Sequence, residues 1–450
     1  MARSPEDERD VLGLVGGLLG LSSGDRTSLG ARLAHCGRLF AAVVNIFANV
    51  SLVTTTGVEL CTGKSAETER ASITAFVFSV SVINLVKAVS LLMQWRRLRR
   101  LVGILEAVRS SFRDPEGARG RYSRHAVVLG RTWVVMATMN VTFWCLDPLI
   151  SQALGGAEQG RQLPLPLWLP IDQTQPSNYG LLFLLESAML ISGVQLSLFI
   201  DALFVTLIIN VTAEIHVLNN NIQNMKNATV RVAGPQSMTA ASAFIRTSQS
   251  TATGDESTLI ATSTRPNIGC INFSTSDFTS ANANNEKSAN DEMYQLLVEN
   301  IRHHQLIIIC VSELEKAVSM GAFALLSINI LNLCSHIFSL VVMLERDTSV
   351  SARTKMFLAV PIFMCQSGLY CLTGQAIIDE SERLVNSAFS CGWPDADERF
   401  KRSLRVFMVR AAQPLRIRVG KLISLSRATF QELLKGSYQL FNVVYQFHTN

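Results

Sequence analysis

The sequence has little charge for its length. Only 17% of its 450 residues are Asp, Glu, Lys or Arg, whereas soluble globular proteins carry about 25%. The mean hydropathy is +0.27, which excludes a disordered chain, a collagen or a coiled coil and disfavours a soluble multidomain enzyme. The net charge of +5 is too small to indicate nucleic-acid binding. A membrane protein with several helical spans is the class that remains.

Paired cysteines and catalytic motifs are also lacking. The nine cysteines are scattered, without a C-x-x-C pair or a Cys/His cluster at metal-binding spacing, which predicts neither a disulfide framework nor a metal site. His303 and His304 are adjacent on a predicted helix, so their side chains diverge by about 100° and cannot chelate one ion. No Ser/His/Asp set, Gly-rich phosphate loop or H-E-x-x-H motif is visible. We therefore expect no enzyme activity and no cofactor.

Long apolar runs are what the sequence has instead. Six runs reach the roughly 20 residues that a spanning helix needs, and a seventh is less apolar because Arg427, Glu432 and Lys435 interrupt it. The sequence thus predicts an all-α membrane protein with seven transmembrane helices. Their expected positions are Leu39–Leu60, Ala71–Met93, Ala126–Ile150, Leu181–Asn210, Val318–Leu344, Lys355–Ile378 and Ser424–Phe447.

Basic residues are distributed unevenly between alternate loops. One set of loops carries about 29 Lys and Arg residues and the other about six, and the more basic loops stay in the cytoplasm. We therefore predict a cytoplasmic N-terminus and an extracellular C-terminus. A G-protein-coupled receptor has the opposite orientation, and the sequence lacks that class's Asp-Arg-Tyr and Asn-Pro-x-x-Tyr motifs. A secondary transporter is disfavoured because no internal repeat is visible.

Lys87 and Asp201 are two of the charged side chains that fall inside the predicted spans. Lys87, near the cytoplasmic end of the second span, is expected to extend toward the membrane surface. Asp201, in the inner half of the fourth span, either pairs with a neighbouring helix or marks a functional site, because an isolated charge in lipid is costly.

The last predicted helix has a polar stripe. At 100° per residue, the side chains of Gln431, Lys435, Gln439, Asn442 and Gln446 fall within an arc of about 80°. Such a stripe must face protein or water, because lipid cannot satisfy it. Copies of the helix around an axis would line an aqueous pore that bordering apolar side chains could close. The alternative is an ordinary polar seam between helices.

The segments between the spans differ in composition. Residues 94–124 are rich in arginine with leucines at helical spacing, which indicates an amphipathic helix that either lies on anionic lipid or docks onto protein.

We divide the chain into a cytoplasmic N-terminal segment (1–38), transmembrane helices 1 to 4 (39–225), a disordered cytoplasmic insertion rich in Ser, Thr and Asn (226–292), helices 5 and 6 with a cytoplasmic extension (293–378), and a cytoplasmic anchor helix with pore-lining helix 7 (379–450).

Several segments resemble one protein family in order and spacing. They are the outer loop L-P-L-P-L-W-L-P-I-D (163–172), the helix I-R-H-H-Q-L-I (301–307), the sixth-span residues Gln366, Tyr370, Cys371 and Gly374, and the C-terminal pieces R-A-A-Q-P-L (410–415), G-K-L (420–422) and L-L-K-G-S-Y (433–438). Together they resemble the insect odorant receptors, of the ligand-specific (tuning) type. Gustatory receptors are a related alternative, but Gln439-Leu440 replace the Thr-Tyr of their C-terminal motif.

The resemblance implies a subunit of a ligand-gated nonselective cation channel in the plasma membrane of an olfactory sensory neuron. It implies a tetramer formed with a shared coreceptor subunit through a cytoplasmic anchor bundle. It also implies contact with membrane lipid and no binding of nucleic acid. Helix 7 would line the pore, with Val443 as hydrophobic gate and Gln446 and Phe447 beside it, next to Gln439 and Asn442. A small volatile ligand would bind in the outer half of the bundle, where the candidates are Phe76, Val80, Asn140, Trp144, Met189, Ser192, Phe357 and Phe363.

Overall fold

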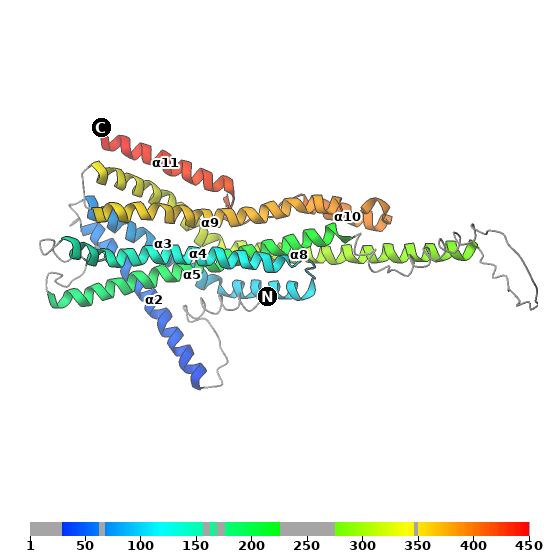
Figure 1. Cartoon of the computed structure of the whole chain (residues 1–450), viewed down its shortest axis with the longest axis horizontal. Coiled ribbons are helices and arrows are strands. Elements are labelled where there is room, and N and C mark those ends of the chain that lie inside the picture. The colour runs from blue at the N-terminus through cyan, green and yellow to red at the C-terminus, as the bar shows by residue number, and fades with distance from the viewer. Residues whose placement is uncertain are drawn as a thin grey trace, which may run out of the picture. The chain divides into compact units, whose positions relative to one another are not determined.

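The computed structural model is built almost entirely from long α-helices (Figure 1). It describes residues 29–62, 68–155, 163–165, 167–168, 176–225, 275–345 and 350–449. The long helices are α2 (Leu29–Thr62), α3 (Thr68–Ser111), α4 (Ala118–Gly155), α5 (Pro176–Gln223), α8 (Thr275–Glu345) and α9 (Val350–Phe389). Each contains a stretch long and apolar enough to cross a membrane. The six plain spans predicted from the sequence are therefore confirmed as helices of suitable length and composition.

Most of these helices are longer than a bilayer requires. α3 has 44 residues and α8 has 71, whereas about 20 suffice to span. The single helix predicted over residues 94–124 is wrong in extent, because α3 ends at Ser111 and residues 118–124 belong to α4. Residues 94–111 form the extension of α3, and their side chains Leu98, Leu101 and Leu105 are at most 1% exposed. The apolar face of this extension therefore packs on protein, which decides between the two interpretations that the sequence left open.

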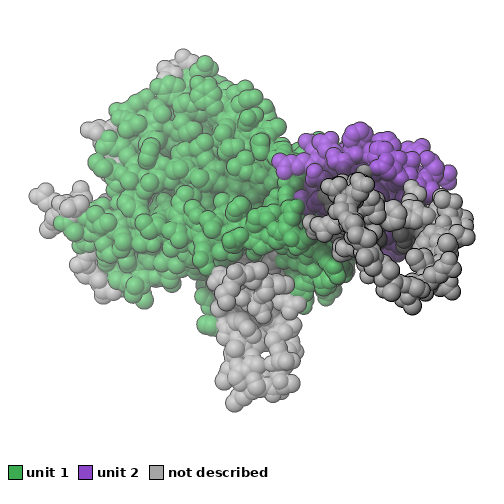
Figure 2. All heavy atoms as spheres, turned by 45° about the vertical axis from the view of Figure 1, so that its right-hand side comes forward, with its two compact units in different colours: residues 1–217, 305–381, 414–450 green, residues 218–304, 382–413 purple. Residues whose placement is uncertain are grey.

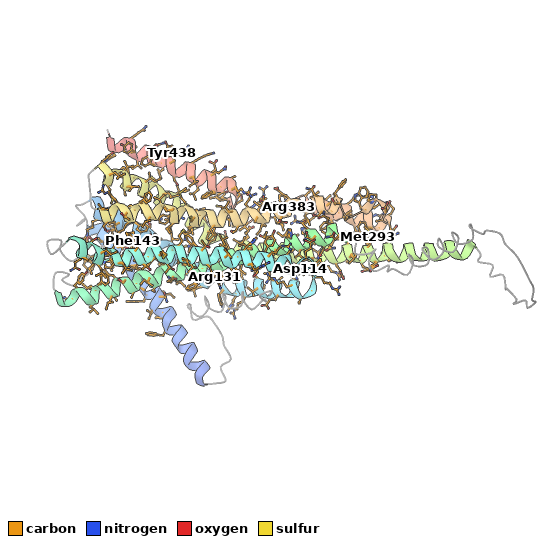
Figure 3. All side chains as sticks on the ribbon, in the orientation of Figure 1. Asp114, Arg131, Phe143, Met293, Arg383 and Tyr438 are labelled. Carbon is orange, nitrogen blue, oxygen red and sulfur yellow. The ribbon has the colours of Figure 1, made fainter. Side chains whose placement is uncertain are left out.

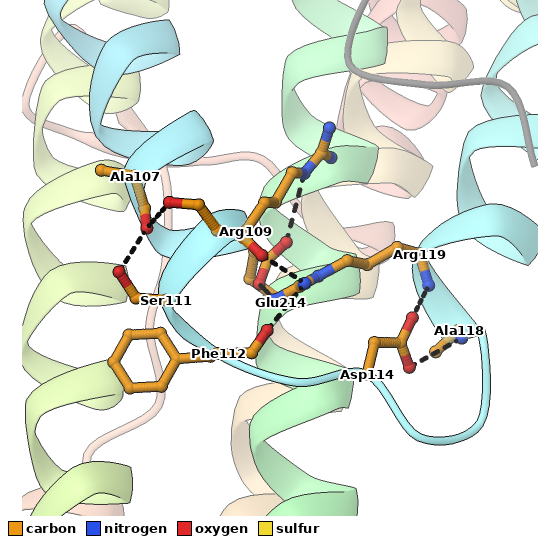
Figure 4. Close-up of polar contacts among 9 residues, drawn as sticks. Ala107, Arg109, Ser111, Phe112, Asp114, Ala118, Arg119 and Glu214 are labelled. Carbon is orange, nitrogen blue, oxygen red and sulfur yellow. Dashed lines mark hydrogen bonds and ion pairs between the residues drawn. The ribbon is translucent and has the colours of Figure 1, made fainter.

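Charged side chains fix the connection between α3 and α4 (Figure 4). The Asp114 carboxylate accepts hydrogen bonds from the backbone N–H groups of Ala118, at 3.0 Å, and Arg119, at 2.8 Å, which caps the start of α4. Glu214 of α5 is 1% exposed and lies 2.8 Å from Arg119 Nη2 and 3.3 Å from Arg109 Nε. The connection between α3 and α4 is thus held by Glu214 of α5 as well as by contacts with its own two helices.

The start of α8 differs from the sequence prediction. Residues 226–274 of the expected disordered insertion lie outside the described residues, but α8 begins at Thr275 instead of near residue 293. Residues 275–292 are therefore helical. The sequence shows no apolar periodicity there, yet adding residues to an existing helix is far easier than nucleating one. The packed part of the helix, from Met293 onward, supplies that nucleus.

The C-terminal region contains shorter elements. The 3₁₀ helix η1 (Trp393–Asp395) and helix α10 (Glu398–Ala411) precede two short strands, β1 (Arg418–Val419) and β2 (Ile423–Ser424), and the final helix α11 (Arg427–Thr449). The strands pair antiparallel, with Val419 opposite Ile423. The fold is otherwise the all-helical one expected, but the seventh helix begins at Arg427 and not at Ser424, because the preceding residues form this hairpin.

The hairpin turn explains the Gly-Lys-Leu motif. Gly420 and Lys421 both have positive φ, 59° and 64°, and the Leu422 N–H donates to the Val419 carbonyl at 3.3 Å, as in a type I′ turn. A Cβ on Gly420 would lie 2.4 Å from the Phe323 ring of α8. Glycine is therefore required here both by the backbone conformation and by the close approach to α8.

The chain forms two compact units (Figure 2). Unit 1 comprises residues 1–217, 305–381 and 414–450, and unit 2 comprises residues 218–304 and 382–413. Helix α5 is the centre of unit 1: in its most apolar stretch 83% of residues are buried, against 28% for α2 and 33% for α4. A helix that is apolar on all sides is typically found buried among other helices. Figure 3 draws the side chains on the ribbon and labels Phe143 on α4 and Tyr438 on α11.

Unit 2 is a small helical bundle. On α10 the side chains Phe400, Leu404, Phe407 and Ala411 recur at helical spacing and are buried, and Asp397 caps the helix through the Glu398 N–H. The His304 ring of α8 packs against Phe407 at 5.2 Å, edge to face. Helical structure in residues 293–304 and 398–411 agrees with the periodicity of the sequence. The cytoplasmic position of this bundle remains a prediction.

Candidate functional site

A small cavity lies among α2, α3, α4 and α5 in unit 1. Its volume is about 50 Å³. The apolar part of its wall includes Leu52, Phe76, Val77, Val80, Leu190 and Val194. Ser81, Asn84 and Asn140 supply polar groups, and Trp144 also lines the cavity. Apolar walls with a few placed polar groups are typical of small-molecule sites.

Helical spacing brings these residues together. Phe76, Val80 and Asn84 are four residues apart on α3, so they share one face. Asn140 and Trp144 have the same spacing on α4. On α5, Gly193 lets α2 approach closely, because a Cβ there would lie 3.0 Å from Asn49 Oδ1. The cavity is thus lined by one face each of α3, α4 and α5, and Gly193 of α5 lets α2 lie close to it.

An aromatic cluster flanks the cavity. The Phe76 ring lies 5.1 Å from Trp144 and 5.8 Å from Phe363 of α9. His336 of α8 stacks on Phe363 at 5.2 Å and meets Phe76 edge-on at 4.7 Å. Phe76 therefore lines the cavity and also contacts rings of α8 and α9 directly.

The structure brings together most of the predicted ligand residues. Phe76, Val80, Asn140 and Trp144 line the cavity. Met189 packs against the same apolar cluster as Trp144, and the Ser192 hydroxyl donates to Asn45 Oδ1 at 2.6 Å. Phe363 joins the aromatic cluster. Phe357 is 63% exposed, so its position does not support the predicted ligand contact.

Several residues of the site were missed by sequence reasoning. Asn84, Leu190 and Gly193 line the cavity, and His336 belongs to the cluster beside it. Asn84 continues the four-residue repeat of Phe76 and Val80, and this repeat is the signal for it in the sequence. No signal in the sequence identified His336, because its ring partners come from two other helices.

A buried ion pair lies elsewhere in the bundle. Lys87 and Asp201 are 2% and 0% exposed, and Lys87 Nζ lies 2.7 and 2.9 Å from the two Asp201 oxygens. Asp201 also accepts hydrogen bonds from Gln366 Nε2, at 2.8 Å, and Tyr370 OH, at 2.7 Å. The expected extension of Lys87 toward the surface is therefore wrong, since a carboxylate is within reach. Asp201 pairs with residues of neighbouring helices, which is one of the two alternatives that the sequence left open.

The final helix packs along one side only. Leu433 and Ser437 of α11 are buried, and the Tyr445 hydroxyl donates to Glu345 of α8 at 3.1 Å. The residues of the polar stripe lie away from this packed side: Gln431, Lys435, Gln439 and Gln446 are exposed and Asn442 is half-buried. The predicted gate residue Val443 is 49% exposed and Phe447 is 82% exposed. The stripe is therefore turned away from the subunit's own core.

Tight contacts join the start of α11 to α9. A Cβ on Gly374 of α9 would lie 2.4 Å from Leu425 Cβ and 2.7 Å from the Leu425 carbonyl. The Arg427 N–H donates to Gln375 Oε1 at 3.1 Å, and Arg427 Nη2 lies 3.1 Å from Asp379 Oδ2. The start of the helix with the polar stripe is thus held directly against α9.

Comparisons with known proteins agree with this architecture. The family model described as 7tm odorant receptor matches residues 68–438. Odorant receptor 10 of Aedes albopictus is 31% identical over 151 residues, which cover 33% of this chain and 38% of the relative. Odorant receptor 19a of Drosophila melanogaster is 25% identical over 152 residues, or 34% and 38% of the two chains. The match thus spans less than two fifths of the length of these relatives.

The fold matches solved structures over its full length. The insect olfactory receptor OR5 from Machilis hrabei, in complex with eugenol, has a TM-score of 0.71 and 14% identity, covering 99% of this chain and 100% of that one. The OR5 structure described without eugenol gives a TM-score of 0.70 and 15% identity over 98% of each chain. The likeness establishes the seven-helix fold, with α11 as the seventh helix.

Proposed function

The chain belongs to the 7tm odorant receptor family, and from this we propose that it is an odorant-binding subunit of a ligand-gated, nonselective cation channel. It is a multi-pass membrane protein. We place it in the plasma membrane of an olfactory sensory neuron, with its N-terminus in the cytoplasm and its C-terminus outside, as the loop charges indicate. Its partner in this proposal is a coreceptor subunit, with which it forms a tetramer.

One observation carries the proposal: the polar stripe of α11 lies away from the subunit's own packing surface. Leu433 is 4% exposed on the packed side, whereas Gln439 and Gln446 are exposed on the other. In a membrane these amides need water or protein. Four helices that present such stripes to a common axis would form a wet conduit, in which Val443 and Phe447 supply apolar side chains able to close it by dewetting.

The cavity among α2 to α5 is the proposed odorant site. It is enclosed mainly by apolar side chains, as a volatile ligand requires. Phe76 and the ring cluster connect it to α9, and α9 is locked to the start of α11 by Gly374 and Leu425. Binding would shift a closed–open equilibrium by the difference in affinity for the two states.

Electrical recording after co-expression tests the proposal. We expect membrane current in response to some member of a volatile panel when the chain is expressed with a coreceptor, and the current should persist when G-protein signalling is blocked. Cells with either subunit's plasmid replaced by an empty vector are the control. A response that needs G proteins would indicate a G-protein-coupled receptor, and substrate-coupled flux without channel openings would indicate a transporter.

A further inference from the structure

Four arginines form a cluster on the extension of α3, and all four are exposed: Arg96, Arg97, Arg99 and Arg100. Helix α3 carries no Asp or Glu between residues 70 and 105. No carboxylate of the described residues forms an ion pair with any of the four. The Arg99 guanidinium lies over the Trp95 ring, 5.9 Å from its centre. The arginine cluster therefore carries four positive charges that no acid in the described part of the chain balances.

The arginine cluster continues the exposed apolar side of α3. At 100° per residue, an arc of about 60° contains Val89, Met93, Arg96 and Arg100. Val89 is 44% exposed and Met93 is 75% exposed, as befits side chains that face lipid in a spanning segment. The opposite side of the helix is buried, with at most 1% exposure at Leu91, Leu98 and Leu105. The arginine cluster thus points away from the protein core and toward the surrounding membrane.

The arginine cluster lies at the depth of the lipid headgroups. The apolar stretch predicted to span the membrane ends at Met93, and α3 continues unbroken to Ser111. The extension therefore crosses the headgroup layer in the direction of the span and does not lie flat on the membrane. At 1.5 Å per residue, Arg96 is about 5 Å beyond Met93 and Arg100 about 10 Å. The headgroup layer is about 5–8 Å thick on each side of the hydrocarbon, so headgroup phosphates are within reach of these long side chains.

A headgroup with several phosphates fits the arginine cluster best. Arginine binds phosphate oxygens through two parallel N–H donors, and four or more basic residues directly after a span are typical of sites for anionic lipids. A phosphate monoester carries about −1.5 to −2 charges at pH 7. An inositol lipid with two monoesters therefore balances the arginine cluster by itself, whereas several molecules of a singly charged lipid such as phosphatidylserine would be needed.

We propose that the arginine cluster binds a polyphosphorylated inositol lipid of the cytoplasmic leaflet. The inference rests on the proposed orientation of the chain, because the cytoplasmic leaflet is the one rich in anionic lipids, and it is independent of the odorant site and the pore. Helix α3 also supplies Phe76 and Val80 to the cavity. The bound lipid therefore holds the extension of a helix that lines the proposed odorant site.

The test measures binding of three probes to the full chain purified in detergent. The probes are fluorescent dioctanoyl phosphatidylinositol 4,5-bisphosphate, dioctanoyl phosphatidylserine and soluble inositol 1,4,5-trisphosphate. We expect the inositol lipid to bind at least tenfold more tightly than phosphatidylserine, because its monoesters pair with more guanidinium groups. It should also bind more tightly than the soluble headgroup, because its acyl chains contact the exposed apolar side of α3 at Val89 and Met93.

Substitutions in the arginine cluster locate the site. Arg96→Gln/Arg97→Gln should weaken binding of the inositol lipid at least fivefold, and Arg96→Lys/Arg97→Lys should weaken it less, because the charge remains and only the paired donors are lost. Arg402→Gln/Arg405→Gln is the matched control. It removes the same charge from two exposed arginines of α10, a helix without a spanning stretch, and should change the affinity by no more than twofold. Melting temperatures check that all variants are folded.

Three results would overturn the inference: no binding of the inositol lipid, equal affinity for phosphatidylserine, or equal losses in the Gln variants of α3 and α10. Binding of the soluble headgroup as tight as that of the lipid would indicate a site for free phosphate compounds and overturn the lipid source. Lipid binding that is lost in Arg96→Gln/Arg97→Gln, in a chain that carries a glycan at Asn227, would support the site but contradict the proposed orientation. The two failures are thus distinguishable.

Discussion

The Lys87 ammonium and the Asp201 carboxylate lie 2.7 Å apart and are both buried within the helix bundle. Tyr370 and Gln366 complete the hydrogen bonding of the carboxylate, so α3, α5 and α9 are joined at one point. Each charge of a buried ion pair needs its partner, because removal of one leaves the other uncompensated in an apolar environment.

Lys87→Met is therefore expected to destabilise the protein by about 3–5 kcal/mol. The readout is the melting temperature of the purified protein in detergent, together with surface expression. Lys316→Met is the matched control: Lys316 is 50% exposed and pairs with Glu313 one turn away on the same helix, so its loss should cost no more than about 1 kcal/mol. The double variant Lys87→Met/Asp201→Leu should recover part of the loss. Equal melting temperatures for Lys87→Met and Lys316→Met would contradict the account of this pair.

Gly374→Ala tests the contact between α9 and the start of α11. The new Cβ would lie 2.4 Å from Leu425 Cβ, and overpacking of this kind costs about 1–3 kcal/mol. We expect lower stability and a changed ligand concentration for half-maximal current. Gly436→Ala on α11 is the control, because no atom lies within 4 Å of the added Cβ; it should stabilise the helix by up to about 1 kcal/mol. If the two substitutions have the same effect, the tight contact is not what couples the helices.

Val443→Ser tests the proposed gate. A hydroxyl near the pore axis would wet the constriction and raise the current without ligand several-fold. Val135→Ser on α4 is a matched control, because Val135 is an exposed valine, at 61%, in a helix that has no part in the proposed pore. Recordings at equal surface expression should show the increase only for Val443→Ser, and an unchanged leak would remove Val443 from the gate.

The sequons at Asn227 and Asn272 test the orientation. Both lie in the loop that the charge distribution places in the cytoplasm, so neither should carry a glycan when the protein is made in cells. A mobility shift after treatment with a glycosidase, abolished by Asn227→Gln or Asn272→Gln, would reverse the proposed orientation.

Hydropathy alone located six helices, because a spanning segment must be apolar along its whole length. The polar stripe on α11 was also predictable, since Gln439 and Gln446 are related by helical geometry within one segment. The partners of Lys87 and Phe76 were not, because they depend on which faces of distant helices meet. Asp201 is 114 residues from Lys87 in sequence, and nothing near either residue indicates the other.

The hairpin before α11 was missed for a similar reason. Gly420 and Lys421 adopt positive φ, but Lys421 is not a residue that marks such a turn. The close approach of Gly420 to Phe323 decides the local conformation, and that contact is set by tertiary packing. The exposed position of Phe357 has the same origin: a helix bears several apolar faces, and the sequence does not tell which one is inside.

Cysteine accessibility along α11 tests the central claim most directly. Asn442→Cys and Gln446→Cys would be exposed to a charged thiol reagent during ligand application, with Cys61 and Cys365, which are exposed native cysteines, replaced by serine. Val444→Cys, on the packed side of the helix, is the control. If α11 lines the pore, the reagent should block current at Asn442→Cys and Gln446→Cys and leave Val444→Cys unaffected. Full current at both stripe positions, in channels shown to be open, would contradict the account.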